Sequence, residues 1–296
     1  MSFHMSLRRK IAIASWSSPK EGNIYGKMSI DMGNALNYID YLRKTSGQRI
    51  TVTHLVGKAA AMAYKDCPDL NGRIFLGRYI PHKTVDMSFL VSLEGGKDLA
   101  KFKVCDMDKK SITDIAAELA AGAERLRQGK DANFEKSKPL IRLFPTWIIR
   151  PLLWLTGYLT GAMGIDAKFL GLEKYPFGAA IITSVGMFGL DEGFAPPTPF
   201  ARVPVYLTIP EVKKRPIVIN DQIVIRPILD LAATVDHRFV DGHRGAMIAK
   251  EIKKMMENPW LMDGLSEAPA LCQDHIDHKI SICENHSASQ IKALSA

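Results

Sequence analysis

The stretch "KRPIVINDQIVIRPILDLAATVDHRFVDG" (214–242) carries the strongest fold signal in the chain. Two β-branched runs flank the dipeptide Asn220-Asp221, which favours a tight turn, so 215–227 is predicted to form a β-hairpin. Residues 228–236 alternate in polarity and predict a further strand. A polar loop follows, and a helix is then predicted over 245–257.

Elements of both kinds precede this stretch. Apolar alternation predicts strands at 27–32, 84–93, 179–185 and 203–209. Helices are predicted from Leu36 to a stop at Gly47, from the N-cap Thr53 to the terminator Pro68, and over 112–127 behind a capping box of Ser111 and Asp114. Because strands and helices are interspersed, the class is mixed α/β, an α+β sandwich around one large sheet.

Composition indicates a folded globular protein, since 47% of its 296 residues are apolar and 24% are charged. The formal net charge of +8 would attract an anionic partner such as nucleic acid, an acidic membrane surface or a phosphorylated cofactor. Charge alone does not choose among these partners.

Cysteine usage and hydropathy indicate a cytoplasmic protein. The four cysteines are scattered, and no signal-peptide pattern precedes the first strand. The most apolar stretch, 144–165, is interrupted by Arg150 and Pro151, which leaves about 14 uncharged residues, too few for a membrane span. The longer region 138–176 fits no simple period.

The loop "DHRFVDG" contains a candidate base. An imidazole with an ordinary pKa near 6.5 can accept a proton at neutral pH, and His237 follows directly on a strand that would fix its backbone. Asp241-Gly242 suits a sharp turn whose carboxylate could hold nearby donors such as an arginine. From spacing alone, an ordinary strand-to-helix turn with exposed charges is the favoured interpretation.

A second motif, "IITSVGMFG" (181–189), leads a predicted strand into Thr183, Ser184 and a glycine turn. A hydroxyl at a strand end can donate a hydrogen bond to a developing oxyanion, and glycines let the backbone approach a ligand. Hydroxyl residues before a glycine turn are also common in purely structural settings.

Five stretches, taken together, resemble one known family: "LRRKIA" (7–12), "ITVTHLVGKAAAMA" (50–63), "IITSVGMFG", the 214–242 block and "MENPWLM" (256–262). The chain resembles the catalytic domain of the 2-oxoacid dehydrogenase acyltransferases, which is structurally related to chloramphenicol acetyltransferase. The resemblance implies a catalytic domain over 1–264 and leaves 265–296 as a polar, loosely ordered tail.

The resemblance implies a homotrimer with active sites in channels between subunits, and it permits shells built from trimers. Acyl-coenzyme A would enter from one side and a dihydrolipoyl-type thiol from the other. His237 would deprotonate the thiol, Thr183 of a neighbouring subunit would stabilise the oxyanion, and Asp241 would keep the loop in shape. Ser184 is an alternative hydroxyl donor, and Gly242 supports the turn. Coenzyme A phosphates would account for the positive charge, so nucleic acid is not expected as a partner.

The chain departs from the family in its accessory modules. We find no lipoyl or subunit-binding module, so a lipoyl group is expected only on a separate carrier protein. Two alternatives therefore stay open: a coenzyme A acyltransferase acting on a hydroxyl, amine or lipid, and a non-catalytic trimeric scaffold associated with a membrane or complex.

Further departures lie in an insert, a loop and the tail. The insert of about 138–176 could be a peripheral membrane contact through 144–165, a lid, or a hydrophobic helix packed on the core or trimer interface. Residues 200–203 differ from the family pattern, which suggests an altered substrate-facing surface. The tail clusters several metal-ligating residue types, but an incidental tail without metal is favoured; these residues are Cys272, His275, His278, Cys283 and His286.

Overall fold

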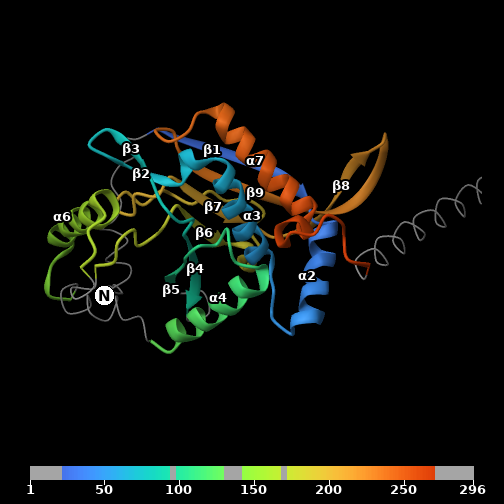
Figure 1. Cartoon of the computed structure of the whole chain (residues 1–296), viewed down its shortest axis with the longest axis horizontal. Helices are drawn as coiled ribbons and strands as arrows, with labels where there is room; N and C mark the ends of the chain where they lie inside the picture. Colours follow the sequence, from blue (N-terminus) through green and yellow to red (C-terminus); the bar gives the residue numbers. More distant parts are fainter. Residues whose placement is uncertain (1–21, 94–97, 130–141, 168–171, 271–296) are drawn as a thin grey trace, which may run out of the picture.

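The computed structural model describes residues 22–93, 98–129, 142–167 and 172–270 (Figure 1). Its centre is a mixed sheet. The strand order is β1 (Asn23–Asp31), β9 (Gln222–Asp236), β7 (Val205–Ile209), β6 (Ala180–Ser184), β4 (Met87–Leu93) and β5 (Asp98–Val104), with β8 (Lys213–Ile219) paired to β9. The β4–β6 and β6–β7 pairs are parallel and the others antiparallel. The predicted mixed α/β class is therefore confirmed.

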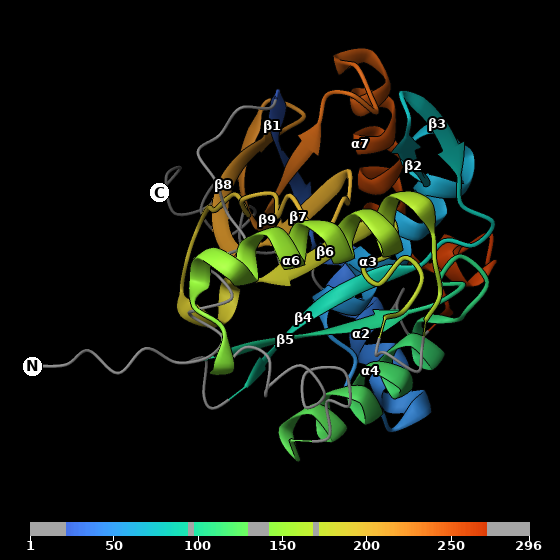
Figure 2. The ribbon, with the colours of Figure 1, turned by 90° about the vertical axis from the view of Figure 1, so that its left-hand side faces the viewer.

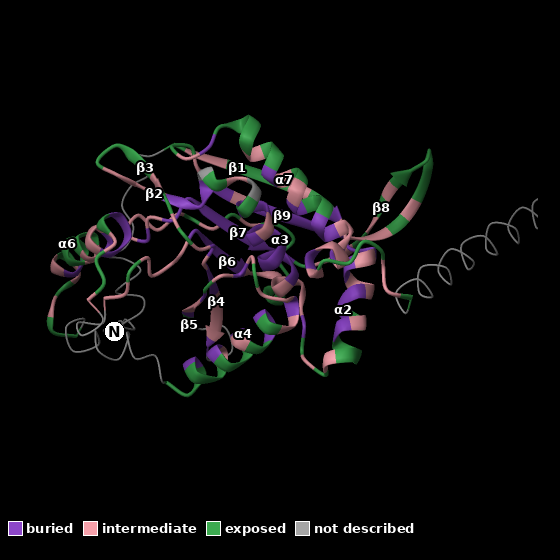
Figure 3. Cartoon of the chain, in the orientation of Figure 1, coloured by how far each residue is buried: buried purple, intermediate pink, exposed green. Residues whose placement is uncertain are grey.

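Four helices cover one face of this sheet: α2 (Gly33–Ser46), α3 (Val52–Asp66), α4 (Ile112–Arg127) and α7 (Gly242–Glu257). Helix α3 packs against α7, α4 and β6. Helix side chains such as Leu55 share one buried cluster with Leu207 and Ile182 of the sheet. Figure 3 colours much of the central strands, and the parts of the helices that face them, purple for buried.

The face of the sheet turned away from these helices is much more polar. Strand residues alternate between the two faces, so neighbours of the buried Ile182 point the other way. Cross-strand register places many polar residues on that second face, namely Lys27, Ser29, Ser88, Lys101, Lys103, Thr183, Thr208, Asp230 and Thr234. Because the covering helices bury only the apolar face, the polar face of the sheet can contact solvent, a ligand or another chain.

One buried carboxylate on the polar face is held by a small network. Asp230 is 4% exposed and accepts hydrogen bonds from the Ser29 hydroxyl, at 2.6 Å, and from Arg215. Burial raises the pKa of Asp230, but the hydrogen bonds from Ser29 and Arg215 outweigh it and the net shift is downward. The carboxylate is thus kept ionised where an unpaired charge would be costly.

Several predicted local features are confirmed. Helix α4 spans 112–127, and Ser111 and Asp114 form its capping box. Gly47 ends α2 in the left-handed conformation. Asn220 and Asp221 have φ of 51° and 61°, which is the turn geometry that the β8–β9 hairpin requires.

Other boundaries were predicted wrongly. The two strands expected at the end of the hairpin and over 228–236 are one continuous strand, β9, paired along its length with β8 and then β1. Helix α3 is capped by Thr51 and not Thr53, because Thr51 can form a capping box with His54. Helix α7 begins at Gly242, three residues before the predicted start, because Asp241 provides the N-cap.

The sequence patterns missed some short elements. The hairpin of β2 (Gly72–Phe75) and β3 (Arg78–Pro81) turns through Leu76 and Gly77, both with positive φ. Strand β5 was also not predicted, and helix α6 (Thr146–Gly157) was expected only as one of several interpretations of the insert, without bounds. Short helical turns complete the described structure: η1 (Pro68–Leu70), the π-helical η3 (Tyr158–Met163), η5 (Gly186–Phe188) and η6 (Pro259–Asp263).

The N-terminus of α3 should weaken in acid. His54 Nδ1 accepts a hydrogen bond from the Thr51 N–H at 3.1 Å, and burial, reinforced by Arg43 and Arg49, lowers the pKa of His54 to about 4. Between pH 6.5 and 4 the unfolded chain binds a proton that the folded chain resists, so stability is full above pH 6.5 and falls toward pH 4.

Urea unfolding at a series of pH values would measure this loss. A His54→Gln variant preserves a capping-box side chain without titrating in this range, so its unfolding free energy should decline less between pH 7 and 5. An equal decline in both proteins would show that His54 does not contribute.

Candidate active site

His237 is the first residue after β9 and its ring is fixed by its own chain. Its backbone N–H donates to the Gly22 carbonyl at 3.1 Å. Its ring Nδ1 lies 2.9 Å from the Val240 carbonyl oxygen. A carbonyl only accepts, so this contact selects the tautomer with the proton on Nδ1 and leaves the Nε2 lone pair for another partner. The His237 side chain lies at the protein surface.

The rest of the motif shapes this loop. Arg238 forms a two-pronged ion pair with Asp236, through Nε and Nη2. Asp241 is the N-cap of α7 and accepts the Arg244 N–H at 2.9 Å. The donor bound by the Asp241 carboxylate is thus a backbone N–H and not an arginine side chain. By capping α7, Asp241 fixes the start of this helix a few residues after His237. Gly242 is the first residue of that helix.

The two candidate hydroxyls point to opposite faces of the sheet. Thr183 pairs in register with Thr208 on the polar face and is 9% exposed. Ser184 pairs with Ile209, a member of the helix-covered core. Just beyond, Gly186 passes so close to the Pro210 carbonyl oxygen that a Cβ would lie 2.8 Å from it, so the turn requires glycine there.

Sheet register separates His237 from Thr183 of the same chain. Thr183 pairs with Thr208, which pairs with Ala232, and His237 lies five residues further along the chain. Two strand spacings and five residue rises correspond to about 19 Å between the two Cα atoms. One chain therefore does not bring these side chains to a common reacting atom, and a site that uses both needs two chains.

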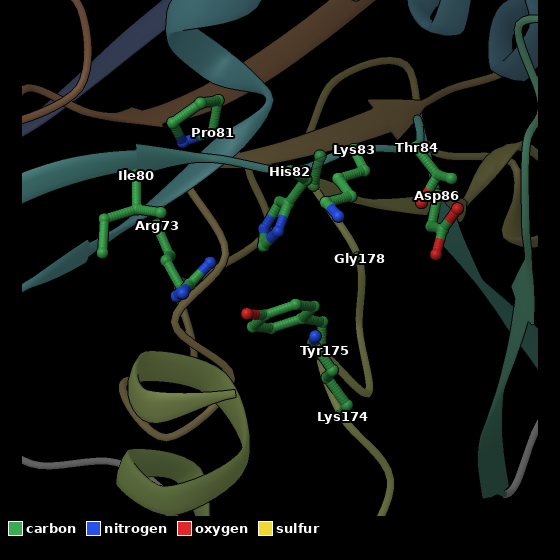
Figure 4. A pocket seen from close by; sticks show the side chains of 11 residues that line it. Arg73, Ile80, Pro81, His82, Lys83, Thr84, Asp86, Lys174, Tyr175 and Gly178 are labelled. Carbon is green, nitrogen blue, oxygen red and sulfur yellow. The ribbon is translucent and has the colours of Figure 1, made fainter. Parts of the chain in front are cut away.

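A cavity of about 390 Å³ lies where β4 and β6 begin (Figure 4). It is lined by Arg73, Ile80, Pro81, His82, Lys83, Thr84, Asp86, Lys174, Tyr175, Gly178 and Ala179. Burial and the charge of Arg73, partly opposed by Asp86, lower the pKa of His82 to about 4. Sequence reasoning missed this cavity; the only local signal was the dipeptide His82-Lys83 ahead of a strand.

The insert packs against residues 200–202 of the same chain. A Cβ on Gly157 of α6 would lie 2.2 Å from the Phe200 carbonyl oxygen, and Arg202 lies over the rings of Trp154 and Tyr158 at 5.6 and 5.1 Å. The insert thus contains a helix that contacts residues 200–202 of the same chain, and its role stays a prediction. Residues 200–203, predicted to alter a substrate-facing surface, include two residues that contact the insert.

The outer side of α6 remains exposed. Trp147 and Leu155 are 75% and 54% exposed, and Figure 2 shows α6 in front of the sheet, away from the covering helices.

Within the described ranges, no helix has both the length and the apolar character needed to cross a membrane. The cysteine and histidine cluster expected in the tail lies outside the described residues.

Comparison with known proteins identifies relatives with a shared core. The chain is 28% identical over 224 residues to a dihydrolipoyllysine-residue succinyltransferase component of the 2-oxoglutarate dehydrogenase complex from Saccharomyces cerevisiae, covering 75% of this chain and 39% of the relative. The corresponding Haemophilus influenzae protein is 28% identical over 268 residues, covering 86% and 53%. The chain thus spans about half the length, or less, of these curated relatives.

A solved structure has the same fold. A probable dihydrolipoamide acetyltransferase from Listeria monocytogenes superposes with a TM-score of 0.66 at 21% identity, covering 92% of this chain and 98% of that chain. The sequence model for "2-oxoacid dehydrogenases acyltransferase (catalytic domain)" matches residues 5–137 and 167–263. It omits 138–166, most of the predicted insert. Because this match covers well over half of the sequence, the chain belongs to the 2-oxoacid dehydrogenase acyltransferase catalytic-domain family.

Proposed function

We propose that this chain catalyses acyl transfer between coenzyme A and a thiol acceptor of the dihydrolipoyl type. The observation that carries the proposal is the contact between His237 Nδ1 and the Val240 carbonyl, which leaves Nε2 as a proton acceptor at the surface. Membership of an acyltransferase family and the acyltransferase names of the relatives support it.

In the proposed reaction, His237 Nε2 takes the proton of the attacking thiol. The thiolate sulfur then bonds to the carbonyl carbon of the acyl thioester, and the carbonyl π electrons move to oxygen. The Thr183 hydroxyl of a neighbouring subunit donates a hydrogen bond to that oxyanion. Collapse of the intermediate breaks the original carbon–sulfur bond, and the leaving thiolate receives the proton from His237. Asp241 holds the helix that follows the base.

A homotrimer would supply the second chain that this mechanism requires. The polar face of the sheet holds Thr183, and the β8–β9 hairpin projects from the body of the protein (Figure 1). This hairpin exposes Val218, Ile223 and Ile225 by 69%, 78% and 72%. Contiguous exposed apolar side chains mark protein interfaces. In this proposal a lipoyl group is presented to the site by a module other than this domain. The proposal also includes the assembly of trimers into larger shells.

Product analysis tests the function. Purified protein is offered acetyl-, succinyl- and long-chain acyl-coenzyme A with free dihydrolipoamide, and the products are identified by mass spectrometry. We expect S-acyl dihydrolipoamide from at least one donor. Transfer only to added alcohols, amines or lipids would favour the alternative acceptor class. No product from any pair would favour the non-catalytic scaffold.

Two narrower proposals concern location. The scattered spacing of the four cysteines in the sequence supports a reducing compartment, which we take to be the cytoplasm. Peripheral membrane contact through 144–165 stays a prediction. It is supported by the exposed Trp147 of α6, by Arg142 and Arg150, and by the lack of acidic residues from 142 to 165.

A further inference from the structure

The cavity at the start of β4 and β6 concentrates positive charge around one aromatic ring. The Arg73 guanidinium carbon lies 4.8 Å from the centre of the Tyr175 ring, and the Lys174 Nζ lies 5.0 Å from it. The His82 ring stands 4.4 Å from the same ring, centroid to centroid. Figure 4 shows Arg73 and His82 directed toward Tyr175, with Lys83 beside them.

This charge is not neutralised within the described structure. Among the described residues, no carboxylate forms an ion pair with Arg73, Lys83 or Lys174. Asp86 is the acidic residue in the lining, and its Oδ1 accepts the Asp106 N–H at 3.1 Å. Glu173, next to Lys174 in sequence, is paired with Lys103 at 2.5 Å and with Lys101 at 4.0 Å.

A buried polar atom also lacks a partner here. His82 Nδ1 is buried and has no hydrogen-bond partner among the described residues. A buried nitrogen without a partner costs free energy unless a ligand or water completes it. Three cations and an unsatisfied imidazole nitrogen lining one cavity form a donor set suited to an oxyanion.

The insert builds part of this cavity. The Ala162 carbonyl accepts from Arg73 Nε at 2.9 Å, and the Thr160 carbonyl accepts the Tyr175 N–H at 3.3 Å. Both carbonyls lie in η3, inside the segment that the family's sequence model omits. The residues that position Arg73 and Tyr175 therefore lie outside the stretches that the family's sequence model matches.

We propose that this cavity binds the phosphate group of a small-molecule ligand, through Arg73, Lys83, Lys174 and the Nδ1–H of His82. Three cations and one carboxylate leave an excess of positive charge that matches a dianion better than a monocarboxylate. The Tyr175 ring and Ile80 provide an apolar surface for the part of the ligand next to the phosphate. Gly178 and Ala179 of the lining precede β6, whereas Thr183 lies near its opposite end, so the site is distinct from that hydroxyl.

Isothermal titration without any acyl donor tests the proposal. The probes are inorganic phosphate and 3′,5′-ADP, which distinguish a free phosphate from the nucleotide end of coenzyme A. We expect the wild type to bind at least one probe, and the Lys83→Gln/Lys174→Gln variant to bind it at least about tenfold more weakly, because each lost charge-assisted hydrogen bond is worth a factor of this order.

A matched control separates this site from general charge attraction. The Lys214→Gln/Lys250→Gln variant has the same net charge, and its substitutions are exposed lysines of β8 and α7 outside the cavity. It should bind like the wild type. Weakening by both double variants alike, or no binding of either probe by the wild type, would overturn the proposal. Binding is read without turnover, so the result does not depend on whether the chain transfers acyl groups.

Discussion

Replacing His237 with alanine is expected to lower kcat/KM for acyl transfer from coenzyme A by about 10²–10⁴-fold, the usual contribution of a placed general base. The loss follows from the ring geometry. With Nδ1 held by the Val240 carbonyl, Nε2 is the nitrogen that can take the thiol proton. Without the imidazole the thiol must ionise unaided at neutral pH. Steady-state kinetics with the donor that gives product in the mass-spectrometric assay provides the measurement.

The fold should survive this change, because the His237 side chain lies at the surface and, among the described residues, its ring bonds only to a neighbouring carbonyl of the same loop. Circular dichroism and size-exclusion chromatography should match the wild type. His243→Ala is the matched control, since His243 is an exposed histidine on the first turn of α7. It should leave turnover nearly unchanged. Wild-type rates in His237→Ala would remove the proposed mechanism.

The sequence predicted best where a local rule determines local structure. The hairpin at Asn220-Asp221 was predictable because few dipeptides tolerate two successive positive φ values. Helix α4 was predictable because Ser111 and Asp114 cap it reciprocally. In contrast, β9 was divided in two after residue 227, yet the strand continues through Pro227, paired first with β8 and then with β1.

The candidate site was only partly predictable for a related reason. The family resemblance of two motifs pointed to His237 and Thr183, but only cross-strand register shows that they are far apart within one chain. Register also places the side chains of Thr183 and Ser184 on opposite faces of the sheet. The sequence alone does not show which of these two faces the helices cover, so it could not choose between the two hydroxyls. The cavity around His82 could not be foreseen, because its residues come from β2, the end of β3, the segment before β4, and residues 174–179 at the end of the insert and before β6.

Removing the Thr183 hydroxyl is expected to have the second largest effect. Thr183→Val keeps the shape of a nearly buried residue but removes the donor, and loss of one oxyanion donor typically costs about 10²–10³ in kcat. Ser184→Ala is the control, because Ser184 lies on the helix-covered side of β6 and should change kcat little. A large loss in Ser184→Ala with a small one in Thr183→Val would exchange their roles.

Mixing the two inactive variants should restore activity. If each site combines His237 of one chain with Thr183 of another, a trimer assembled from both variants regains complete sites at interfaces where the intact side chains meet. With equal amounts and random assembly, this is about a quarter of the interfaces, and activity should return to about that fraction of wild type. If both side chains acted within one chain, no mixture would contain a complete site and co-expression would restore nothing. Recovery therefore reports on the separation of about 19 Å that sheet register imposes inside a single chain.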